Sequence, residues 1–397
     1  MKKFIGLLII GLLAGCGRSG NGLPDSGNWA LFRGDAGLRG YADVSLPDKP
    51  ALLWIYKSDA RTASSPVIYS QTAYWSDKRG RIYGIDAEGK PVFEYDFATA
   101  VEASPMISDS ILYIGRIDGF MSALSLNGKD TLWNFETLGQ ISASPNAGVF
   151  KGKEAVVFGS YDNFLYCVDK KSGKEINRFE SGYYINGAVA VLQKYFVSGG
   201  CDAWLRIIDG ETGNASDSLL LDTYIPASPA IDGNDCYIAD HSGNVYALTV
   251  ENGKIRNSRK MLAATDNSGA FVSVPALSPT SVYILSDDRH LYATDRKTGE
   301  IRWKYLQKGN SGESSPLVCR DKIISCTKTG IISLIDARNG SLLWEYDTGE
   351  QITASPAAIK DRFYILTAKG TLFCFGKEYS TQMTQMIQIY TDRYGKI

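Results

Sequence analysis

The stretch from Glu313 to Tyr346 reads ESSPLVCRDKIISCTKTGIISLIDARNGSLLWEY, and its pattern decides the fold. It contains four short apolar runs, separated by three turns that carry Asp, Gly or Asn-Gly, as expected for β-strands joined by tight turns. Each run alone leaves an apolar face open to water, so the unit is stable only when it packs against copies of itself. The stretch therefore predicts a repeat protein built from four-stranded units.

The copies follow one another at intervals of about forty residues. Their openings are Ser65-Pro66, Ser104-Pro105, Ser144-Pro145, the drifted Tyr184–Ala188, Ser228-Pro229, the variant Val274-Pro275, Ser315-Pro316 and Ser355-Pro356. The eighth copy stops near Phe375 without a fourth run, whereas an isolated fourth run, Leu52 to Tyr56, stands at the front. We therefore predict an all-β protein, an eight-bladed β-propeller of four-stranded antiparallel blades over residues 29–376, with its last blade closed by the N-terminal strand.

The composition excludes several classes of function. The chain has 397 residues, of which 44% are hydrophobic, and a net charge of -1. A near-neutral chain gives no reason to expect nucleic-acid binding, which needs a basic surface. The sequence contains no P-loop, dinucleotide fingerprint or hydrolase elbow. We expect a monomer.

The first residues have the pattern of a secretory signal. Lys2 and Lys3 precede an apolar run, Phe4 to Leu13, that is too short to span a bilayer, so residues 1–15 are predicted to be a signal peptide. The sequence Leu13-Ala14-Gly15-Cys16 resembles a bacterial lipobox, which implies cleavage before Cys16 and acylation of that residue. Several acyl chains would anchor the protein stably in a membrane. An ordinary signal peptide with a chance cysteine is the alternative.

The two ends of the predicted domain carry short extra segments. Residues 16–28 are rich in glycine and are expected to form a flexible tether. They lack both an acidic cluster and an aspartate after Cys16, which favours the periplasmic side of the outer membrane in a Gram-negative source. In residues 377–397, Tyr379, Met383, Met386 and Tyr390 fall at helical spacing. A short amphipathic helix packed on the propeller is predicted there, with a partner-docking helix or a disordered tail as alternatives.

A second motif recurs in the last part of several repeats. Asp295, Gly299 and Trp303 have the same spacing as Asp336, Gly340 and Trp344. This resembles the tryptophan-docking motif of pyrroloquinoline-quinone (PQQ) dehydrogenase-like propellers, in which the aromatic residue packs between neighbouring blades. The resemblance implies that the docking aromatics are Trp54, Phe93, Trp133, Phe179, Trp303 and Trp344. The fourth and fifth repeats lack the aromatic residue, and we expect looser packing there.

Within that superfamily, the lipobox, the eight repeats and the mature length of about 380 residues resemble the family of the outer-membrane β-barrel assembly factor B (BamB). The resemblance implies a non-enzymatic, lipid-anchored scaffold in the cell envelope that uses no cofactor. Its partners would be proteins in the periplasm, among them a barrel-assembly subunit. The Leu/Arg contact loop associated with that family is not evident in this sequence.

Two other functions are compatible with the fold. One is a sensor that binds a ligand or glycan at the mouth of the central channel. The other is a PQQ-dependent oxidoreductase, but such enzymes typically carry a vicinal cysteine pair. Here the cysteines of the repeats are isolated from one another, namely Cys167, Cys201, Cys236, Cys319, Cys326 and Cys374.

The only two histidines, His241 and His290, lie in predicted turns of the fifth and sixth repeats, next to Asp240, Asp287 and Asp288. Such residues could form a metal or acid–base site, but solvated turn residues are the favoured interpretation. An aspartate also recurs once per repeat, at Asp86, Asp169, Asp209, Asp295 and Asp336. A catalytic group is needed once and a packing device once per repeat, so this pattern indicates a structural role. We therefore predict no catalytic, cofactor-binding or metal-binding residue.

Overall fold

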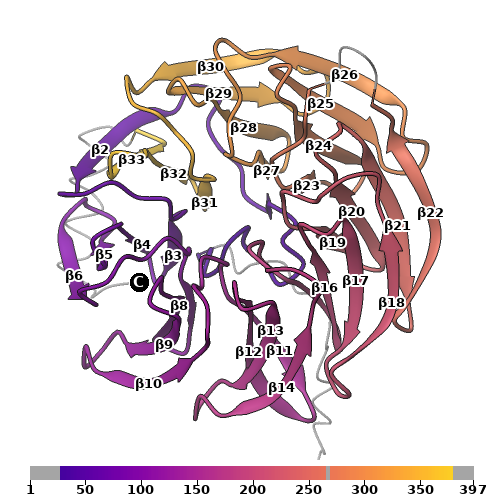
Figure 1. The fold of residues 1–397 in the computed structure, drawn as a ribbon. Coiled ribbons are helices and arrows are strands. Elements are labelled where there is room, and N and C mark those ends of the chain that lie inside the picture. Colours follow the sequence, from indigo (N-terminus) through magenta and orange to yellow (C-terminus); the bar gives the residue numbers. More distant parts are fainter. Residues whose placement is uncertain (1–26, 265–268, 379–397) are drawn as a thin grey trace, which may run out of the picture.

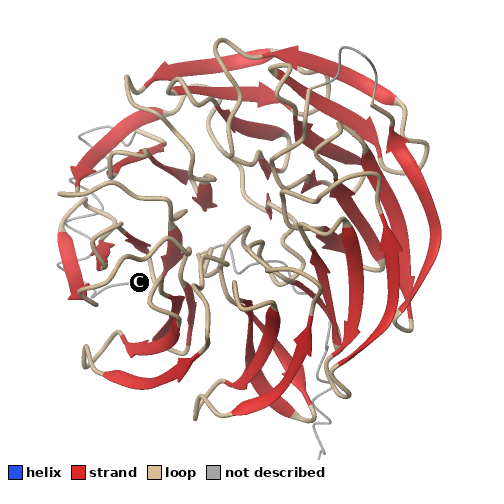
Figure 2. Ribbon diagram, viewed as in Figure 1, coloured by secondary structure: helices blue, strands red, loops and turns tan. Residues whose placement is uncertain are grey.

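The structure, a computed structural model, describes residues 27–264 and 269–378 of this protein. These residues form β-strands and no helix (Figure 2). The strands group into eight sheets that are arranged radially around a common centre (Figure 1). Each sheet contains four antiparallel strands that follow one another from the centre outward, and one sheet has in addition the short parallel strand β1 (Tyr41–Ala42) at its inner edge. The prediction of an all-β, eight-bladed propeller is confirmed.

The first four blades are consecutive in the sequence. Blade 1 consists of β3 (Val67–Tyr69), β4 (Thr72–Ser76), β5 (Arg81–Ile85) and β6 (Pro91–Asp96), and blade 2 of β7 (Met106–Ser108), β8 (Ile111–Gly115), β9 (Phe120–Ser125) and β10 (Thr131–Glu136). Blade 3 consists of β11 (Asn146–Phe150), β12 (Lys153–Gly159), β13 (Phe164–Asp169) and β14 (Glu175–Glu180), and blade 4 of β15 (Ala190–Leu192), β16 (Tyr195–Gly199), β17 (Trp204–Asp209) and β18 (Asn214–Leu220).

The other four blades complete the ring. Blade 5 consists of β19 (Ala230–Asp232), β20 (Asp235–Ala239), β21 (Val245–Glu251) and β22 (Lys254–Leu262), and blade 6 of β23 (Ala276–Leu277), β24 (Ser281–Leu285), β25 (His290–Asp295) and β26 (Ile301–Leu306). Blade 7 consists of β27 (Leu317–Cys319), β28 (Lys322–Cys326), β29 (Ile331–Asp336) and β30 (Leu342–Asp347), and blade 8 of β31 (Ala357–Ile359), β32 (Arg362–Leu366), β33 (Thr371–Gly376) and β2 (Ala51–Lys57).

The burial of the strands explains the sequence pattern. The two middle strands of a blade have neighbours on both faces, so β8 and β9 are buried over most of their length. The outer strand β10 alternates between buried or half-buried and exposed residues, because one of its faces meets solvent. Continuous apolar runs therefore mark the middle strands, and alternation marks the outer one.

The ring closes by pairing the two ends of the described chain. Strand β2 is antiparallel to β33, with Leu52 opposite Phe375 and Tyr56 opposite Leu372. This confirms the predicted closure of the last blade by the N-terminal strand. The β2–β33 pairing supplies the fourth strand that the eighth repeat lacks.

A segment that the repeat pattern does not explain lies inside the ring. Residues 29–42, which we call the strap, follow the innermost strands around the centre (Figure 1). The strap forms main-chain hydrogen bonds with the innermost strands of blades 1, 2, 4, 5, 6 and 7, and its β1 (Tyr41–Ala42) pairs in parallel with β27. Trp29, Arg33 and Leu38 are each 1% exposed, so the strap fills the centre of the propeller at the level of these strands.

The recurring aspartates have a structural role in the turns that precede the outer strands. The carboxylates of Asp86, Asp169, Asp209, Asp295 and Asp336 each accept a hydrogen bond from the backbone N–H two residues later. An aspartate that holds its own turn in this way is a common turn-forming device.

The predicted signal peptide, the predicted acylation site at Cys16, most of the predicted tether and nearly all of the C-terminal tail lie outside the described residues. Among the residues that are described, no helix is long and apolar enough to cross a membrane.

Candidate partner-binding surface

The predicted docking tryptophans lie between neighbouring blades. The indole Nε1 of Trp54, Trp133 and Trp303 donates to a backbone oxygen of the next blade, at Ala87 (2.9 Å), Lys170 (3.1 Å) and Ala337 (3.1 Å) respectively. Each indole also lies against a turn glycine of that blade, Gly89, Gly173 or Gly340. Each of these three tryptophans thus joins its own blade to the following one.

Two further predicted aromatics occupy the same strand position without such a hydrogen bond. Phe93 is buried, and the Nζ of Lys129 from the next blade lies 5.4 Å from its ring centroid. Trp344 lies 5.3 Å from the ring of Phe375 in blade 8.

Phe179 does not lie at the docking position of its blade. In blade 2, Trp133 pairs with Ala123, and in blade 3 the equivalent residue Cys167 pairs with Asn177. Asn177 therefore occupies the docking position, and Phe179 lies two residues beyond it. In blades 6 and 7 the docking tryptophan follows the turn glycine by four residues, and the residue four after Gly173 is Asn177, whereas the prediction took the next aromatic residue of the strand.

The docking positions of blades 3, 4 and 5 are all polar. Asp217 of blade 4 accepts a hydrogen bond from the backbone N–H of Ile255 (2.9 Å). Arg259 of blade 5 donates to three backbone oxygens of the next blade. The interfaces that lack an aromatic residue are thus held by hydrogen bonds.

The histidines do not form one site. His290 Nδ1 lies 3.4 Å from Asp288 Oδ2, whereas His241 stacks on Tyr224 with ring centroids 4.4 Å apart. Burial raises the pKa of Asp287, and the nearby His241 opposes this effect. Among the described residues, no three side chains of His, Cys, Asp and Glu gather closely enough to hold a metal ion.

A ring of serines surrounds the mouth of the central channel. The hydroxyl oxygens of five of the six Ser-Pro serines, Ser315, Ser355, Ser65, Ser104 and Ser144, each accept a backbone N–H of the preceding blade over 2.8–3.1 Å. The ring is interrupted at blades 4 and 6, where the equivalent residues are Ala188 and Val274. Below the serines lies a cavity of about 240 Å³, and Phe32 of the strap is part of its lining.

Aromatic side chains gather on the same face, over blades 3 to 5. We call this group the tyrosine patch, and its members are Leu138, Tyr161, Tyr183, Tyr184, Tyr224 and His241. Leu138 is 95% exposed, and Tyr161, Tyr183 and Tyr224 are 38–44% exposed. Single exposed apolar residues are normal on a protein surface, but clustered exposed aromatic residues are typical of a binding site.

Stacking orders one half of the tyrosine patch. The rings of Tyr161 and Tyr184 are nearly parallel, with centroids 4.9 Å apart, and the Tyr184 hydroxyl donates to that of Tyr183 (3.1 Å). This hydrogen bond raises the pKa of Tyr184, so its hydroxyl stays neutral at physiological pH. The loop of Tyr224 adjoins this half, because the N–H of Ile225 donates to the backbone oxygen of Gly200 (3.2 Å).

The position of these residues in the repeat indicates that they are not required for folding. In seven blades, the loop that enters the blade is hydrogen-bonded to the turn between the two middle strands. A backbone oxygen of this incoming loop accepts the backbone N–H of a residue in that turn. This position holds Tyr161 in blade 3, and His241 with Tyr224 in blade 5, while Tyr184 is the equivalent loop residue of blade 4. The other five blades carry Arg61 with Lys78, Ala100 with Ile117, Ala270 with Asp287, Asn310 with Lys328 and Gln351 with Ala368. Since the fold accepts such different residues here, the aromatic residues of blades 3 to 5 serve another purpose.

The sequence analysis missed this patch. The available signal was the loss of the Ser-Pro dipeptide in the fourth repeat, where Tyr183-Tyr184 stands in the incoming loop. An aromatic residue at the tip of a neighbouring turn, such as Tyr161, is recognised only after the eight repeats have been superimposed.

Comparison of the sequence with known proteins points to one family. Residues 43–178, 122–271 and 264–390 match the family model described as "Outer membrane protein assembly factor BamB". An outer membrane protein assembly factor BamB from Shewanella oneidensis is 22% identical over 283 residues, which are 66% of this chain and 67% of that protein.

Two solved structures show the same fold. The crystal structure of BamB from Moraxella catarrhalis has a TM-score of 0.70 at 17% identity and covers 83% of this chain and 98% of that one. Quinohemoprotein alcohol dehydrogenase from Comamonas testosteroni has a TM-score of 0.72 at 14% identity, with 89% and 81% covered.

Proposed function

This chain belongs to the family of the outer membrane protein assembly factor BamB, and on that premise we propose that it is a non-enzymatic scaffold that binds a protein partner through the tyrosine patch. The relatives named above support a role in outer-membrane assembly. We further propose that the chain is held at the periplasmic side of the outer membrane by acylation of Cys16.

The observation that carries the proposal is the tyrosine patch, an aromatic surface confined to three adjacent blades. Tyrosine provides a large contact area at a low cost in side-chain entropy, and its hydroxyl keeps the surface compatible with water. Interface centres are enriched in aromatic residues for this reason. Because the turns of the propeller are held by hydrogen bonds, the propeller is suited to present such a surface rigidly.

The partner we propose is a barrel-assembly subunit exposed to the periplasm. The test is co-purification from membranes of cells that express the tagged wild-type chain or the double variant Tyr184→Ser, Tyr224→Ser. We expect the double variant to recover at least tenfold less of the subunit, because two adjacent aromatic contacts are removed together.

The matched control is Leu342→Ser, which removes an apolar side chain that is 42% exposed on the outer strand of blade 7. It should leave recovery of the subunit unchanged. Equal recovery with the wild type and the tyrosine double variant, at equal protein levels, would contradict the proposal.

A second candidate function rests on the cavity beneath the serine ring. Its lining combines the ring of Phe32 with serine hydroxyls and the carboxylates of Glu102 and Glu313. An aromatic ring below hydroxyl and carboxylate groups is suited to a neutral sugar. Saturable binding of a disaccharide that is lost in Phe32→Ala would favour this function, and the absence of binding by the wild type would remove it.

A further inference from the structure

A cavity of about 460 Å³ lies between blades 5 and 6, away from the tyrosine patch. Its lining comes from β20, β21 and β22 of blade 5 and from two turns of blade 6. One of these turns contains Pro279, and the other contains Arg296 and Lys297. By the antiparallel order of the strands, these turns lie on the face opposite the serine ring.

The cavity exists because of the residue at the docking position of blade 5. Where other blades place an indole against the turn of the next blade, β22 places the guanidinium of Arg259. Its Nη1 donates to the backbone oxygen of Thr298 (2.8 Å), and its Nη2 donates to those of Arg296 (3.2 Å) and Lys297 (2.5 Å). Arg259 thus makes hydrogen bonds to the next blade as the indole does in other blades, but it has no ring to fill the space. The space beside the guanidinium stays open.

The cavity carries positive charge that the described residues do not neutralise. Three cations line it, Arg259, Arg296 and Lys297, with the single carboxylate of Asp235. Arg296 is paired with Asp232 (2.6 Å) and Asp235 (3.3 Å). Within the described part of the chain, no carboxylate lies within 4.0 Å of the charged nitrogens of Arg259 or Lys297.

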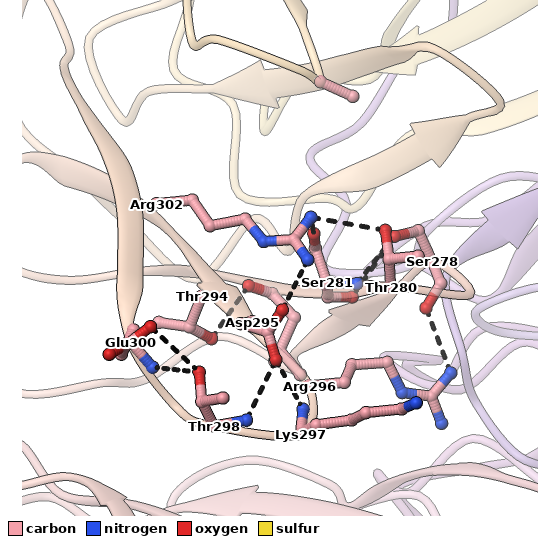
Figure 3. Close-up of polar contacts among 12 residues, drawn as sticks. Ser278, Thr280, Ser281, Thr294, Asp295, Arg296, Lys297, Thr298, Glu300 and Arg302 are labelled. Carbon is pink, nitrogen blue, oxygen red and sulfur yellow. Dashed lines mark hydrogen bonds and ion pairs between the residues drawn. The ribbon is translucent and has the colours of Figure 1, made fainter.

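The turn that contains Asp295 orients the side chains of Arg296 and Lys297. The Asp295 carboxylate is held by the backbone N–H groups of Lys297 and Thr298 and by Arg302. Figure 3 shows the side chains of Arg296 and Lys297 running in the same direction away from the Asp295 carboxylate. The Asp295 carboxylate is therefore engaged by its own turn and by Arg302, and it does not compensate Arg259 or Lys297.

We propose that this cavity between blades 5 and 6 binds a small anionic ligand through a phosphate or carboxylate group. Arg259 and Lys297 supply the charge, and the polar side chains of Thr249 and Asn257 lie in the same lining. A guanidinium without a carboxylate partner in a half-buried site attracts an anion more strongly than one in open water, and charge-assisted hydrogen bonds are the stronger ones. The volume suits a small molecule and is too small for a folded partner.

The test is isothermal titration of the full chain at low salt with inorganic phosphate and, separately, with succinate. We expect saturable binding of at least one anion, and the one that saturates identifies the group recognised. Lys297→Gln should weaken that binding at least tenfold. Arg259→Trp should abolish it, because an indole fills the cavity and removes a charge.

The control is Lys171→Gln, which removes an exposed lysine at the same turn position of blade 3, where the indole of Trp133 is present. This variant should bind the anion as the wild type does. If neither anion binds saturably to the wild type, or if Lys171→Gln weakens binding as much as Lys297→Gln, the proposal is overturned. Lys297 is exposed, so its variant is informative even if Arg259→Trp fails to fold.

Discussion

At the scale of single residues, the docking tryptophans constrain the turns that they contact. Gly340 has a φ of +75°, and a Cβ added to it would lie 2.7 Å from Cε3 of Trp303. Gly349 has a φ of +67°, but a Cβ added there would meet nothing within 4 Å. The two glycines therefore share the backbone conformation and differ only in the presence of the indole.

We predict that Gly349→Ala lowers the free energy of unfolding by about 1 kcal/mol, the cost of a left-handed conformation. Gly340→Ala should lower it by about 3 kcal/mol, because the methyl group also displaces the indole. Urea denaturation of both variants measures the difference. Equal losses would mean that the indole does not pack against this turn in solution.

Buried thiols make the stability depend on alkaline pH. Burial raises the pKa of Cys167, Cys326 and Cys374 from 9.0 to about 12. Between these values the unfolded chain has lost thiol protons that the folded chain keeps. The free energy of unfolding should therefore fall as the pH rises through this range, by up to about 1.4 kcal/mol per thiol and pH unit.

The measurement is urea denaturation at pH 8.0, 8.5 and 9.0, below the pKa of about 10 at which the tyrosines of the unfolded chain titrate. A variant with alanine at all three cysteines should be less stable at pH 8.0 because of the cavities left behind, yet lose less stability per pH unit. An unchanged slope in that variant would show that other groups titrate.

At the scale of elements, the serine ring links the innermost strands of successive blades. Ser104 Oγ accepts the buried backbone N–H of Ser65 (2.8 Å), so Ser104→Ala leaves that donor unpaired. We predict a loss of about 1–3 kcal/mol in the free energy of unfolding. Ser228 has the same place in blade 5, but it follows the interruption at Ala188, and no hydrogen bond of its hydroxyl is found among the described residues. Ser228→Ala should therefore cost less than about 0.5 kcal/mol, and thermal and urea denaturation of the pair provide the comparison.

The elements also show how far sequence reasoning reaches. The number of blades and their strand order were predictable, because the same apolar pattern of four strands recurs in each repeat. The docking residue of blade 3 was missed, because the prediction assumed an aromatic residue there, whereas the four-residue spacing from Gly173 leads to the polar Asn177. The tyrosine patch was not predictable, since loops from three blades meet there and loop sequences carry no periodic signal.

At the scale of the whole molecule, the strap holds the ring from inside. The backbone oxygens of Trp29, Gly37 and Gly40 accept hydrogen bonds from blades 1, 5 and 7, and the strap buries Trp29 and Leu38. Sequence reasoning placed residues 29–50 in the domain but gave them no element, because they lack strand alternation. Their role emerges only from the closed ring that they line.

We predict that a chain starting at residue 43 melts at least about 10 °C below one starting at residue 27. Both retain β2 and the closure of blade 8, so the difference isolates the strap. Calorimetry of the two chains measures it. Identical melting temperatures would mean that the strap does not stabilise the ring.

The pairing of β2 with β33 has a consequence for how the protein is made. Residues 51–57 leave the ribosome early, whereas their partners, residues 371–376, emerge roughly 300 residues later. At typical rates of synthesis this delay is on the order of 15–60 s. During that time the apolar strand β2 has no partner strand. The nascent chain therefore depends on chaperones that shield β2 until the last repeat has been made.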